Sequence, residues 1–429
     1  MKDKLNVCLL NDSFVPAVDG VVNVIRNYAS VINESYGSAS VVAPSTPGFV
    51  DDFPYDVVRY PSVNTTRLFG YRSGDPFDSK LIDTLSGKNF NIIHSHCPFA
   101  SGYAARLLRY RTNTPLVFTY HTKFDYDIKR VIALKGVQNA AVRMALSNIA
   151  ACDEVWTVSH GASENLYSLG YEGECVVMNN GVDLPQGRLV KKERRRIDEL
   201  HSLPQGVPLY LFVGRMQWYK GIRLILEALD MVKRQGRDFR MIFVGTGMEE
   251  NEIKAYCRKL GVDDKCIFAG VVRDRQLIRA YFSRCDLFLF PSMFDTNGLV
   301  VREAAACGLA SVLIKGSCAS EGVTDGKNAL LIEESAAALA SLLLDIDEKY
   351  IYMKALGDNA MKDLYISWDD AVASAVERYN IVLDRAAEKR SCGIALKEDK
   401  AFIAYADSML RGVTKIKGLP KEIRKRFKS

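Results

Sequence analysis

The sequence lacks the features that define several protein classes. No apolar run approaches the roughly 18–20 residues that a membrane-spanning helix needs. Its ten cysteines include no Cys-x-x-Cys pair, so nothing supports a zinc or thioredoxin-like motif. Low-complexity tracts and repeats of 20–50 residues are also missing. The first ten residues are too short and too interrupted for a signal peptide, and we expect a first β-strand in a reduced, cytoplasmic protein.

The composition is that of a folded globular protein. Of the 429 residues, 48% are hydrophobic and 25% are charged, which excludes wholesale disorder. The length exceeds one ordinary domain of about 100–200 residues, so we expect two domains. The net charge of +6 is too small to indicate a nucleic-acid partner, and no helix-turn-helix or aromatic stacking platform accompanies it.

Short apolar runs alternate with turn signals or helix-like stretches, in two series. The first series lies at 5–10, 39–43, 91–94, 115–119, 154–158 and 175–178, and the second at 208–214, 240–244, 265–269, 286–290, 310–314 and 329–332. This alternation predicts an α/β protein with two doubly wound, Rossmann-like domains. We predict an N-terminal domain over 1–185, a charged linker over 186–207, a C-terminal domain over 208–365, a helix over 366–390 that packs back on the N-terminal domain, and a basic tail over 391–429.

Ligands of open α/β sheets bind at the carboxyl ends of the strands, so the residues that follow each strand are the candidates. Gly20 and Val21 begin a helix after the first strand, where free backbone amides favour an anion. Gly214-Arg215 and Lys220-Gly221 follow the first strand of the second series. A guanidinium and an ammonium there suit a diphosphate, and a surface loop with two solvated charges is the alternative.

The densest candidate region follows the apolar run that ends at Pro291. Asp295, Thr296 and Asn297 form a loop, and Gly298 and Leu299 then open a helix that carries Glu303. The two carboxylates can lie along an elongated polyhydroxyl ligand while the amides of the helix start bind a phosphate. The alternative is an N-cap at Asp295 and an ion pair of Glu303 at the edge of the core.

Other patterns have ordinary structural interpretations. His94, His96 and His121 follow neighbouring strands, but a zinc site has no supporting carboxylate or cysteine pattern, and we favour polar histidines lining a cleft. Asp125 and Asp127 have the Asp-x-Asp spacing of a metal–nucleotide site, and we interpret them as a solvated pair. Gly245-x-Gly247 lacks the third glycine of a dinucleotide fingerprint and predicts a tight strand-to-helix turn.

In their order, these motifs resemble glycosyltransferase family 4 over roughly residues 5–385. The segments that carry the resemblance are Asp12-x-x-x-Pro16 with Gly20-Val21, 119–122, 158–159, 179–183, 214–221, 268–272, 291–300 and 303–308. The resemblance implies a GT-B fold, two Rossmann-like domains facing across a cleft. It also implies transfer of a sugar from a nucleotide-sugar, with retention at the anomeric carbon, no cofactor and no obligatory metal.

The resemblance also implies residue roles. Arg215 and Lys220 hold the donor diphosphate, with Gly214 beside them, and Glu303 binds the ribose hydroxyls. The other donor-binding residues are Val272 by the base, the loop Thr296 and Asn297, the amides of Gly298 and Leu299, and Gly20 and Val21 from the other domain. His121 sits near the reacting sugar. Asp295 replaces the usual first glutamate of the family's paired motif, which puts the identity of the donor sugar in question.

Within the family, residues 119–126 and 295–300 look most like the bacterial diacylglycerol glucosyltransferases. Between Ala104 and Ala150, eight Lys and Arg residues oppose two Asp, and the stretch from Arg411 holds eight basic residues and one acid. Such segments favour an anionic membrane surface, and solubilising faces are the alternative.

We therefore expect a hexosyltransferase that uses UDP-glucose and a lipid or lipid-linked acceptor. It is expected to be cytoplasmic, with a peripheral position at the inner face of the plasma membrane left open. Synthesis of a capsule, teichoic-acid or other cell-wall glycan is one alternative. A non-catalytic nucleotide-sugar-binding protein is an alternative of another class.

Overall fold

The chain folds into two α/β units. The computed structural model describes residues 4–17, 19–66, 72–345 and 350–392. Among these, unit 1 comprises the residues up to 158, residues 162–179 and residues from 368 on, and unit 2 comprises 159–161 and 180–367. Beyond residue 392, the predicted basic tail lies outside the described residues.

Unit 1 is built on a seven-stranded parallel sheet in the order β3-β2-β1-β6-β7-β8-β9. The strands are β1 (Leu5–Leu10), β2 (Gly37–Pro44), β3 (Asp56–Tyr60), β6 (Ile92–Ser95), β7 (Leu116–Tyr120), β8 (Glu154–Thr157) and β9 (Cys175–Val177). A separate antiparallel pair is formed by β4 (Ser62–Val63) and β5 (Ser73–Gly74). The central strands are buried on both faces, which explains their nearly continuous apolar sequences.

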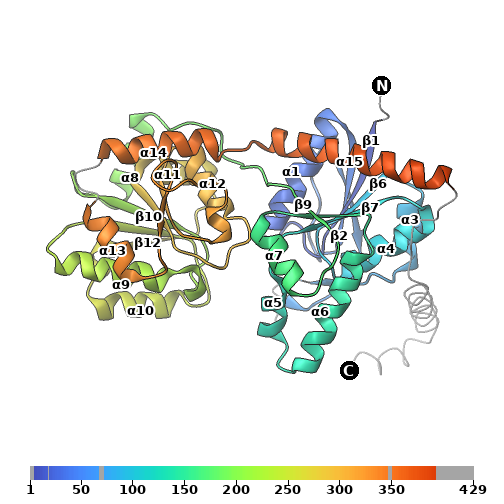
Figure 1. Cartoon of the computed structure of the whole chain (residues 1–429), viewed down its shortest axis with the longest axis horizontal. Coiled ribbons are helices and arrows are strands. Elements are labelled where there is room, and N and C mark those ends of the chain that lie inside the picture. Colours follow the sequence, from blue (N-terminus) through green and yellow to red (C-terminus); the bar gives the residue numbers. More distant parts are fainter. Residues whose placement is uncertain (1–3, 18, 67–71, 346–349, 393–429) are drawn as a thin grey trace. The chain divides into compact units, whose positions relative to one another are not determined.

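The helices of unit 1 cover both faces of this sheet. They are α1 (Gly20–Ser35), α3 (Ser79–Ser86), α4 (Ala100–Thr112), α5 (Phe124–Val131), α6 (Lys135–Ala150), α7 (His160–Ser168) and α15 (Trp368–Ser391). Figure 1 shows α1 and α15 on one face and α4 and α6 on the other. The last helix, α15, thus belongs to unit 1, and its Tyr379 is fully buried there.

Unit 2 is built on a six-stranded parallel sheet in the order β12-β11-β10-β13-β14-β15. The strands are β10 (Leu209–Val213), β11 (Arg240–Val244), β12 (Cys266–Gly270), β13 (Leu287–Phe290), β14 (Ser311–Ile314) and β15 (Leu330–Ile332). Renumbered along each unit, both sheets begin with the order 3-2-1-4-5-6 that typifies the dinucleotide-binding fold. The doubly wound architecture predicted from the sequence is confirmed.

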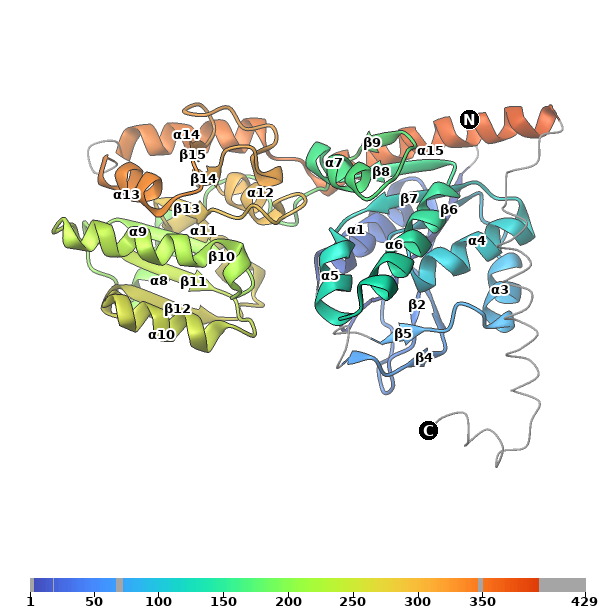
Figure 2. The ribbon, with the colours of Figure 1, turned by 60° about the horizontal axis from the view of Figure 1, so that its bottom comes forward.

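Helices also cover both faces of the second sheet. They are α8 (Lys191–His201), α9 (Ile222–Arg234), α10 (Glu250–Leu260), α11 (Arg275–Arg284), α12 (Leu299–Ala306), α13 (Ala336–Asp345) and α14 (Tyr350–Asp363), with the single-turn 3₁₀ helices η1 (Trp218–Lys220), η2 (Asp263–Lys265) and η3 (Cys318–Ser320). Figures 1 and 2 show α9, α10 and α13 on one face of the sheet, and α8, α11, α12 and α14 on the other.

The segment predicted as a linker, 186–207, is instead part of unit 2. Its helix α8 exposes the basic side chains of Lys191, Lys192, Arg195 and Arg196, but its Ile197 is fully buried. Arg284 of α11 forms an ion pair with Asp198 at 2.6 Å. The run of charged residues therefore predicted a solvated segment, but the buried side chain of Ile197 is enough to attach this short helix to the core.

Two features of the described residues bear on the sequence expectations. All ten cysteines are free thiols, four of them buried, and Cys392 is exposed. The described part of the chain contains no helix that is both long and apolar enough to cross a bilayer.

Candidate functional site

The predicted cation Lys220 and the predicted carboxylate Asp295 meet in unit 2. Lys220 ends η1 in the loop after β10, and Asp295 lies in the loop after β13, the neighbouring strand. The Lys220 ammonium donates to Asp295 Oδ1 at 2.6 Å, and their side chains are 13% and 20% exposed. The carboxyl ends of parallel strands thus bring together two residues that the sequence separates.

Glycines allow these loops to approach each other. Gly221 has a φ of 79°, and a Cβ there would lie 2.0 Å from the carbonyl oxygen of Pro291, in the loop that leads to Asp295. A Cβ at Gly245 would lie 2.0 Å from the oxygen of Gly214, and one at Gly247 2.3 Å from the oxygen of Met216. The Gly245-x-Gly247 turn therefore supports the loop that carries Lys220, which gives its glycines a packing reason.

We expect Gly247→Ala to lower both stability and turnover. The new methyl group must displace the Met216 backbone, which costs about 1–3 kcal/mol of unfolding free energy and moves the loop that carries Lys220. Gly136→Ala is the matched control, because a Cβ there has no atom within 4 Å. Urea unfolding and glycosyl-transfer rates measure the two effects, and wild-type values for Gly247→Ala would contradict the packing argument.

Asp295 has hydrogen-bonding capacity beyond its ion pair. Its Oδ2 is buried and has no hydrogen-bond partner among the described residues. A buried carboxylate oxygen of this kind is costly unless a donor reaches it. A sugar hydroxyl is a donor of the right chemistry. The alternative role, an N-cap of α12, is wrong, because the residue at that position is Gly298.

Gly298 is the N-cap of helix α12 and has a φ of 62°. No side chain caps its first turn, so the amides predicted to bind a phosphate are not taken by a cap. A Cβ at Gly298 would lie 3.0 Å from the Cα of Ala319. A side chain here would therefore be strained by the positive φ and would crowd the Ala319 backbone. Thr296 and Asn297 precede it, half-buried and buried respectively.

Glu303, on the second turn of α12, is held by an arginine. Arg275 at the start of α11 donates to Glu303 Oε1 at 2.9 Å and lies 3.6 Å from Asp183. Burial raises the pKa of the Glu303 carboxyl, and Arg275 opposes that rise. The ion pair that the sequence left open as the structural alternative is therefore present. Arg275 itself was missed, because nothing in the sequence links residue 275 to residue 303.

The remaining predicted donor residues of unit 2 differ in exposure. Arg215 follows β10 directly and is exposed, and within the described ranges its guanidinium makes no hydrogen bond or ion pair. Gly214 lies between β10 and Arg215, and Val272 is half-buried against the core after β12. The structure thus gives Lys220 a fixed partner and leaves Arg215 accessible.

The predicted residues of unit 1 lie in the first turn of α1 and just after β7. Gly20 and Val21 form the first turn of α1, where the Asp19 side chain accepts a hydrogen bond from Val22 N at 2.8 Å. His121 follows β7 and is only 7% exposed. Burial lowers its pKa to about 3, so the imidazole is neutral at pH 7.

His121 belongs to a buried cluster of three histidines. His96 Nδ1 lies 2.9 Å from His121 Nε2, while His94 bonds through Nδ1 to the Tyr379 hydroxyl at 2.6 Å and through Nε2 to Thr119 Oγ1 at 2.7 Å. Among the described residues, no group of three His, Cys, Asp or Glu side chains is arranged to hold a metal ion. The prediction that all three histidines line a cleft is wrong for His94, which is fully buried.

Two other sequence interpretations need correction. Asp125 is not solvated: it is 4% exposed and pairs with Lys129 at 2.7 Å, because α5 turns it inward. Arg106 and Arg109, counted as surface charge, are also buried. Arg106 donates to Asn148 at 2.9 Å, and Arg109 pairs with Asp153 at 3.2 Å.

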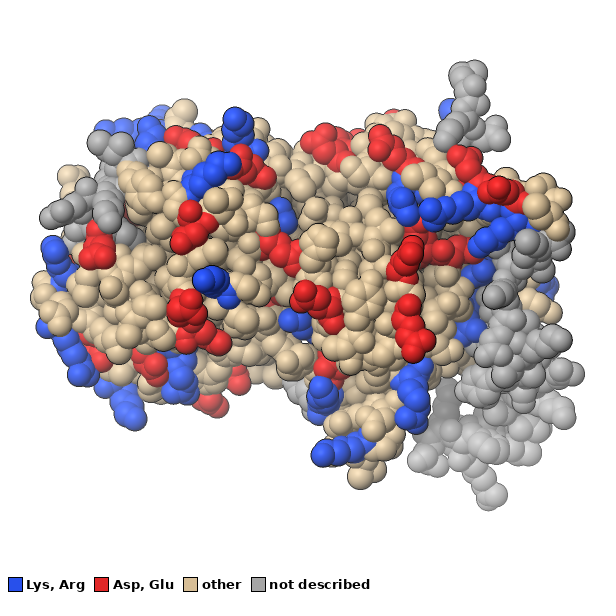
Figure 3. Space-filling model, in the orientation of Figure 1, with Lys and Arg blue, Asp and Glu red and all other residues tan. Residues whose placement is uncertain are grey.

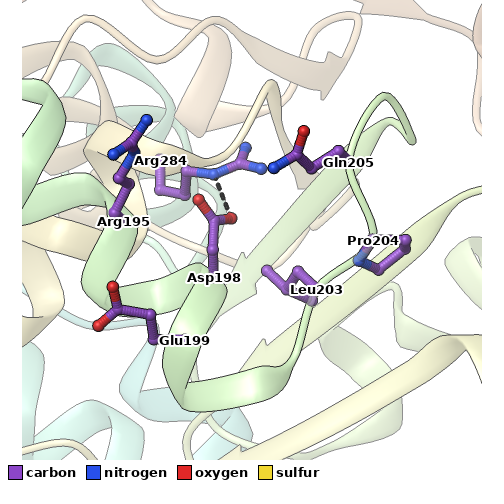
Figure 4. A pocket seen from close by; sticks show the side chains of 7 residues that line it. All are labelled: Arg195, Asp198, Glu199, Leu203, Pro204, Gln205 and Arg284. Atoms are coloured by element: carbon purple, nitrogen blue, oxygen red, sulfur yellow. Dashed lines mark hydrogen bonds and ion pairs between the residues drawn. The ribbon is translucent and has the colours of Figure 1, made fainter.

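A pocket of about 210 Å³ in unit 2 lies away from the predicted site (Figure 4). Its lining includes residues 203–205, just before β10, and Arg284, just before β13. It therefore sits at the amino ends of these strands, opposite the carboxyl ends where such sheets bind ligands. The ion pair between Arg284 and Asp198 joins two of the four charged residues of its lining.

Two family models match consecutive parts of the chain. The model described as Glycosyltransferase Family 4 matches residues 18–186, and the model described as Glycosyl transferases group 1 matches residues 193–363. The first match covers most of the N-terminal half, and the second contains Arg215, Lys220, Asp295 and Glu303.

Several characterised proteins are similar in sequence. Alpha-monoglucosyldiacylglycerol synthase of Streptococcus pneumoniae is 24% identical over 71% of this chain and 70% of its own length. A GDP-mannose-dependent alpha-mannosyltransferase of Corynebacterium glutamicum is 24% identical over 88% and 89%. D-inositol 3-phosphate glycosyltransferase of Acidothermus cellulolyticus is 27% identical over 70% and 69%.

Solved structures share the fold. Sucrose-phosphate synthase of Thermosynechococcus elongatus has a TM-score of 0.73 at 19% identity, covering 89% of this chain and 100% of that one. HepE of Anabaena, in complex with UDP and glucose, has a TM-score of 0.70 at 18% identity, covering 87% and 99%. The paired doubly wound sheets and these solved structures show the GT-B fold, and the two family models, which together match most of the chain, identify it as a glycosyltransferase related in its N-terminal part to Glycosyltransferase Family 4.

Proposed function

We propose that this glycosyltransferase moves a hexose from UDP-glucose to a membrane lipid or lipid-linked acceptor, with retention at the anomeric carbon and without an obligatory metal. The observation that carries the proposal is the pair of Lys220 and Asp295 at the carboxyl ends of β10 and β13, next to the free first turn of α12. A cation and helix amides suit a diphosphate, and a carboxylate suits sugar hydroxyls.

In the proposed reaction, the bond between the anomeric carbon and the diphosphate oxygen breaks. The acceptor hydroxyl oxygen bonds to the same face of that carbon, and its proton passes to the departing diphosphate. Lys220 and Arg215 neutralise the charge that develops on the diphosphate, and the α12 amides bind it. Asp295 Oδ2 accepts a hydrogen bond from the donor sugar, and Glu303, placed by Arg275, binds the ribose.

The donor and acceptor assignments rest on different supports. A nucleotide donor with uracil is supported by the fold neighbour from Anabaena, whose structures hold UDP, glucose or UDP-glucose. A lipid acceptor is supported by the name of the Streptococcus pneumoniae relative. His121, Gly20 and Val21 keep the roles predicted from the sequence: contact with the reacting sugar, and approach to the donor.

The surface of unit 1 gives a physical reason for a lipid acceptor. On α5, α6 and the turn between them, exposed apolar side chains alternate with exposed cations. We call this set the hairpin surface: Tyr126, Leu134, Val137, Met144, Lys129, Lys135 and Arg143. Figure 3 shows Lys and Arg side chains over this end of unit 1, with uncharged surface between them. Exposed apolar groups beside cations favour the interface of an anionic bilayer.

The proposed reaction is tested with a panel of nucleotide-sugars and extracted membrane lipid. We expect transfer from UDP-glucose into lipid, with the product keeping the donor's anomeric configuration and with EDTA leaving the rate unchanged. Transfer from UDP-glucose only into a glycan acceptor would favour cell-wall glycan synthesis instead. Binding of UDP-glucose with neither transfer nor hydrolysis would favour a non-catalytic role, and a strict metal requirement would overturn the metal-free mechanism.

Membrane binding through the hairpin surface gives a separate prediction. Leu134 is 70% exposed, and its insertion into the interface contributes about 1.5 kcal/mol or more, so Leu134→Ser should weaken binding to anionic vesicles roughly tenfold. Added salt should weaken binding further, because the cations contribute. Met248→Ser is the control, since Met248 is 74% exposed in unit 2. Equal losses in vesicle sedimentation for both variants would exclude the hairpin surface.

A further inference from the structure

Two neutral imidazoles in unit 1 share one hydrogen bond. His96 and His121 follow the neighbouring strands β6 and β7, and His96 Nδ1 lies 2.9 Å from His121 Nε2. Their rings stack, with centroids 5.2 Å apart and planes inclined by 22°. Both are buried, at 4% and 7% exposure, and burial lowers both pKa values below the usual value for histidine.

A hydrogen bond between neutral imidazoles fixes both tautomers at once, because each ring carries one proton. If His121 Nε2 is the donor, the proton of His96 must lie on Nε2. If His96 Nδ1 is the donor, His96 Nε2 carries only a lone pair, and the proton of His121 must lie on Nδ1. The surroundings of His96 Nε2 therefore decide which nitrogen of His121 carries the proton.

His96 Nε2 is buried and has no hydrogen-bond partner among the described residues. The centroid of the His94 ring lies 4.0 Å from that of the His96 ring, but both nitrogens of His94 are already bonded, to Tyr379 and to Thr119. An N–H at His96 Nε2 would thus be a buried donor without an acceptor. Orphaned donors are rarer in proteins than under-satisfied acceptors, so the lone pair is the favoured state there.

We infer that His96 is a positioning residue: it keeps its proton on Nδ1 and donates it to His121 Nε2, so that His121 carries its own proton on Nδ1. The inference rests on the proposed function for its consequence, since a hydroxyl oxygen of the donor sugar that reaches His121 Nδ1 then meets an N–H donor and not an acceptor. Because burial keeps the ring neutral, this donor persists at mildly acidic pH.

The tautomer is measured directly by NMR. The chain contains five histidines, so labelling with ¹⁵N-histidine gives five imidazoles. Long-range ¹H–¹⁵N spectra distinguish protonated from bare ring nitrogens, and His160→Gln and His201→Gln assign the two rings outside the cluster. We expect the wild-type protein to show His121 protonated on Nδ1 and His96 protonated on Nδ1. A proton on His121 Nε2, or averaged shifts from a mixture, would overturn the inference.

Two substitutions of His96 connect the tautomer to turnover. In His96→Asn, the amide nitrogen can replace Nδ1 as donor, and in His96→Leu the donor is lost. We expect His96→Leu to lower kcat by roughly 10- to 100-fold with little change in the donor KM, the range typical of losing a group that orients a functional imidazole. His96→Asn should restore most of the rate and the wild-type His121 shifts. Equal kcat for the two variants would contradict a positioning role.

The NMR measurement needs no substrate, which separates this inference from the proposed function. If the His121 proton lies on Nδ1 and no sugar is transferred, the proposed function fails and the tautomer assignment stands. If transfer is observed and the proton lies on Nε2, the inference about His96 fails alone.

Discussion

Replacing Lys220 with alanine lowers kcat/KM for glycosyl transfer roughly 30- to 1,000-fold. This corresponds to a loss of about 2–4 kcal/mol of transition-state stabilisation, the scale of losing one preorganised electrostatic contact. The reason is position as well as charge. The ammonium is 13% exposed and held 2.6 Å from Asp295 Oδ1, so little reorganisation is needed when negative charge develops on the diphosphate. Its removal also leaves the Asp295 carboxylate without a cation.

The matched control is Lys233→Ala. Lys233 also forms an ion pair with an aspartate, Asp264 at 3.0 Å, but its side chain is 36% exposed and lies at the end of α9. We expect its turnover to match that of the wild-type protein. Steady-state kinetics with saturating acceptor measure both variants. Unchanged turnover of Lys220→Ala would remove Lys220 from the site, and equal losses in the two variants would point to a general loss of charge.

Acid should unfold unit 1 well before its carboxylates are protonated. His94, His96 and His121 have pKa values lowered by burial, to about 3 for His121, against about 6.5 in the unfolded chain. Between these values the unfolded state binds more protons than the folded state, so stability is present above pH 6.5 and is lost as the pH falls toward 3. At pH 5 the loss is about 2 kcal/mol for His121. The lowered pKa values of His94 and His96 act in the same direction.

Tryptophan fluorescence can report this loss from unit 1 alone. In Trp218→Phe, the remaining tryptophans are Trp156 and Trp368, both buried in unit 1. We expect the urea midpoint of this variant to fall sharply between pH 7.5 and pH 5. Removing one titrating group by His121→Gln should make the dependence on pH shallower. A midpoint that does not change with pH would show that the histidines are not held neutral.

The sequence was sufficient to place the candidate residues at the ends of strands but not to predict their contacts. The apolar runs that end at residues 213 and 290 predicted two strand ends, and the parallel sheet makes those ends neighbours. The ion pair of Lys220 with Asp295 joins residues 75 positions apart, and that of Arg275 with Glu303 joins two helices. Such pairs depend on loop geometry and helix orientation, which no local pattern encodes.

Charge runs and burial caused the clearest errors. Segment 186–207 was predicted as a linker from its basic residues, but Leu189 and Ile197 attach it to unit 2. The reverse error concerns Arg106 and Arg109, counted as surface charge although they are buried with Asn148 and Asp153 as partners. A charged residue can be buried where the fold brings a partner to it, and that partner is set by tertiary structure.

The return of α15 to unit 1 has a consequence for synthesis of the protein. Tyr379, which bonds to His94, is 285 residues later in the chain, and Arg378, 224 residues after Glu154, pairs with that buried carboxylate at 2.6 Å. A ribosome that adds about 5–20 residues per second needs roughly 15–60 s to synthesise the 285 residues from His94 to Tyr379. During that time the sheet of unit 1 emerges without α15. The whole of unit 2 is synthesised before α15 can pack against that sheet.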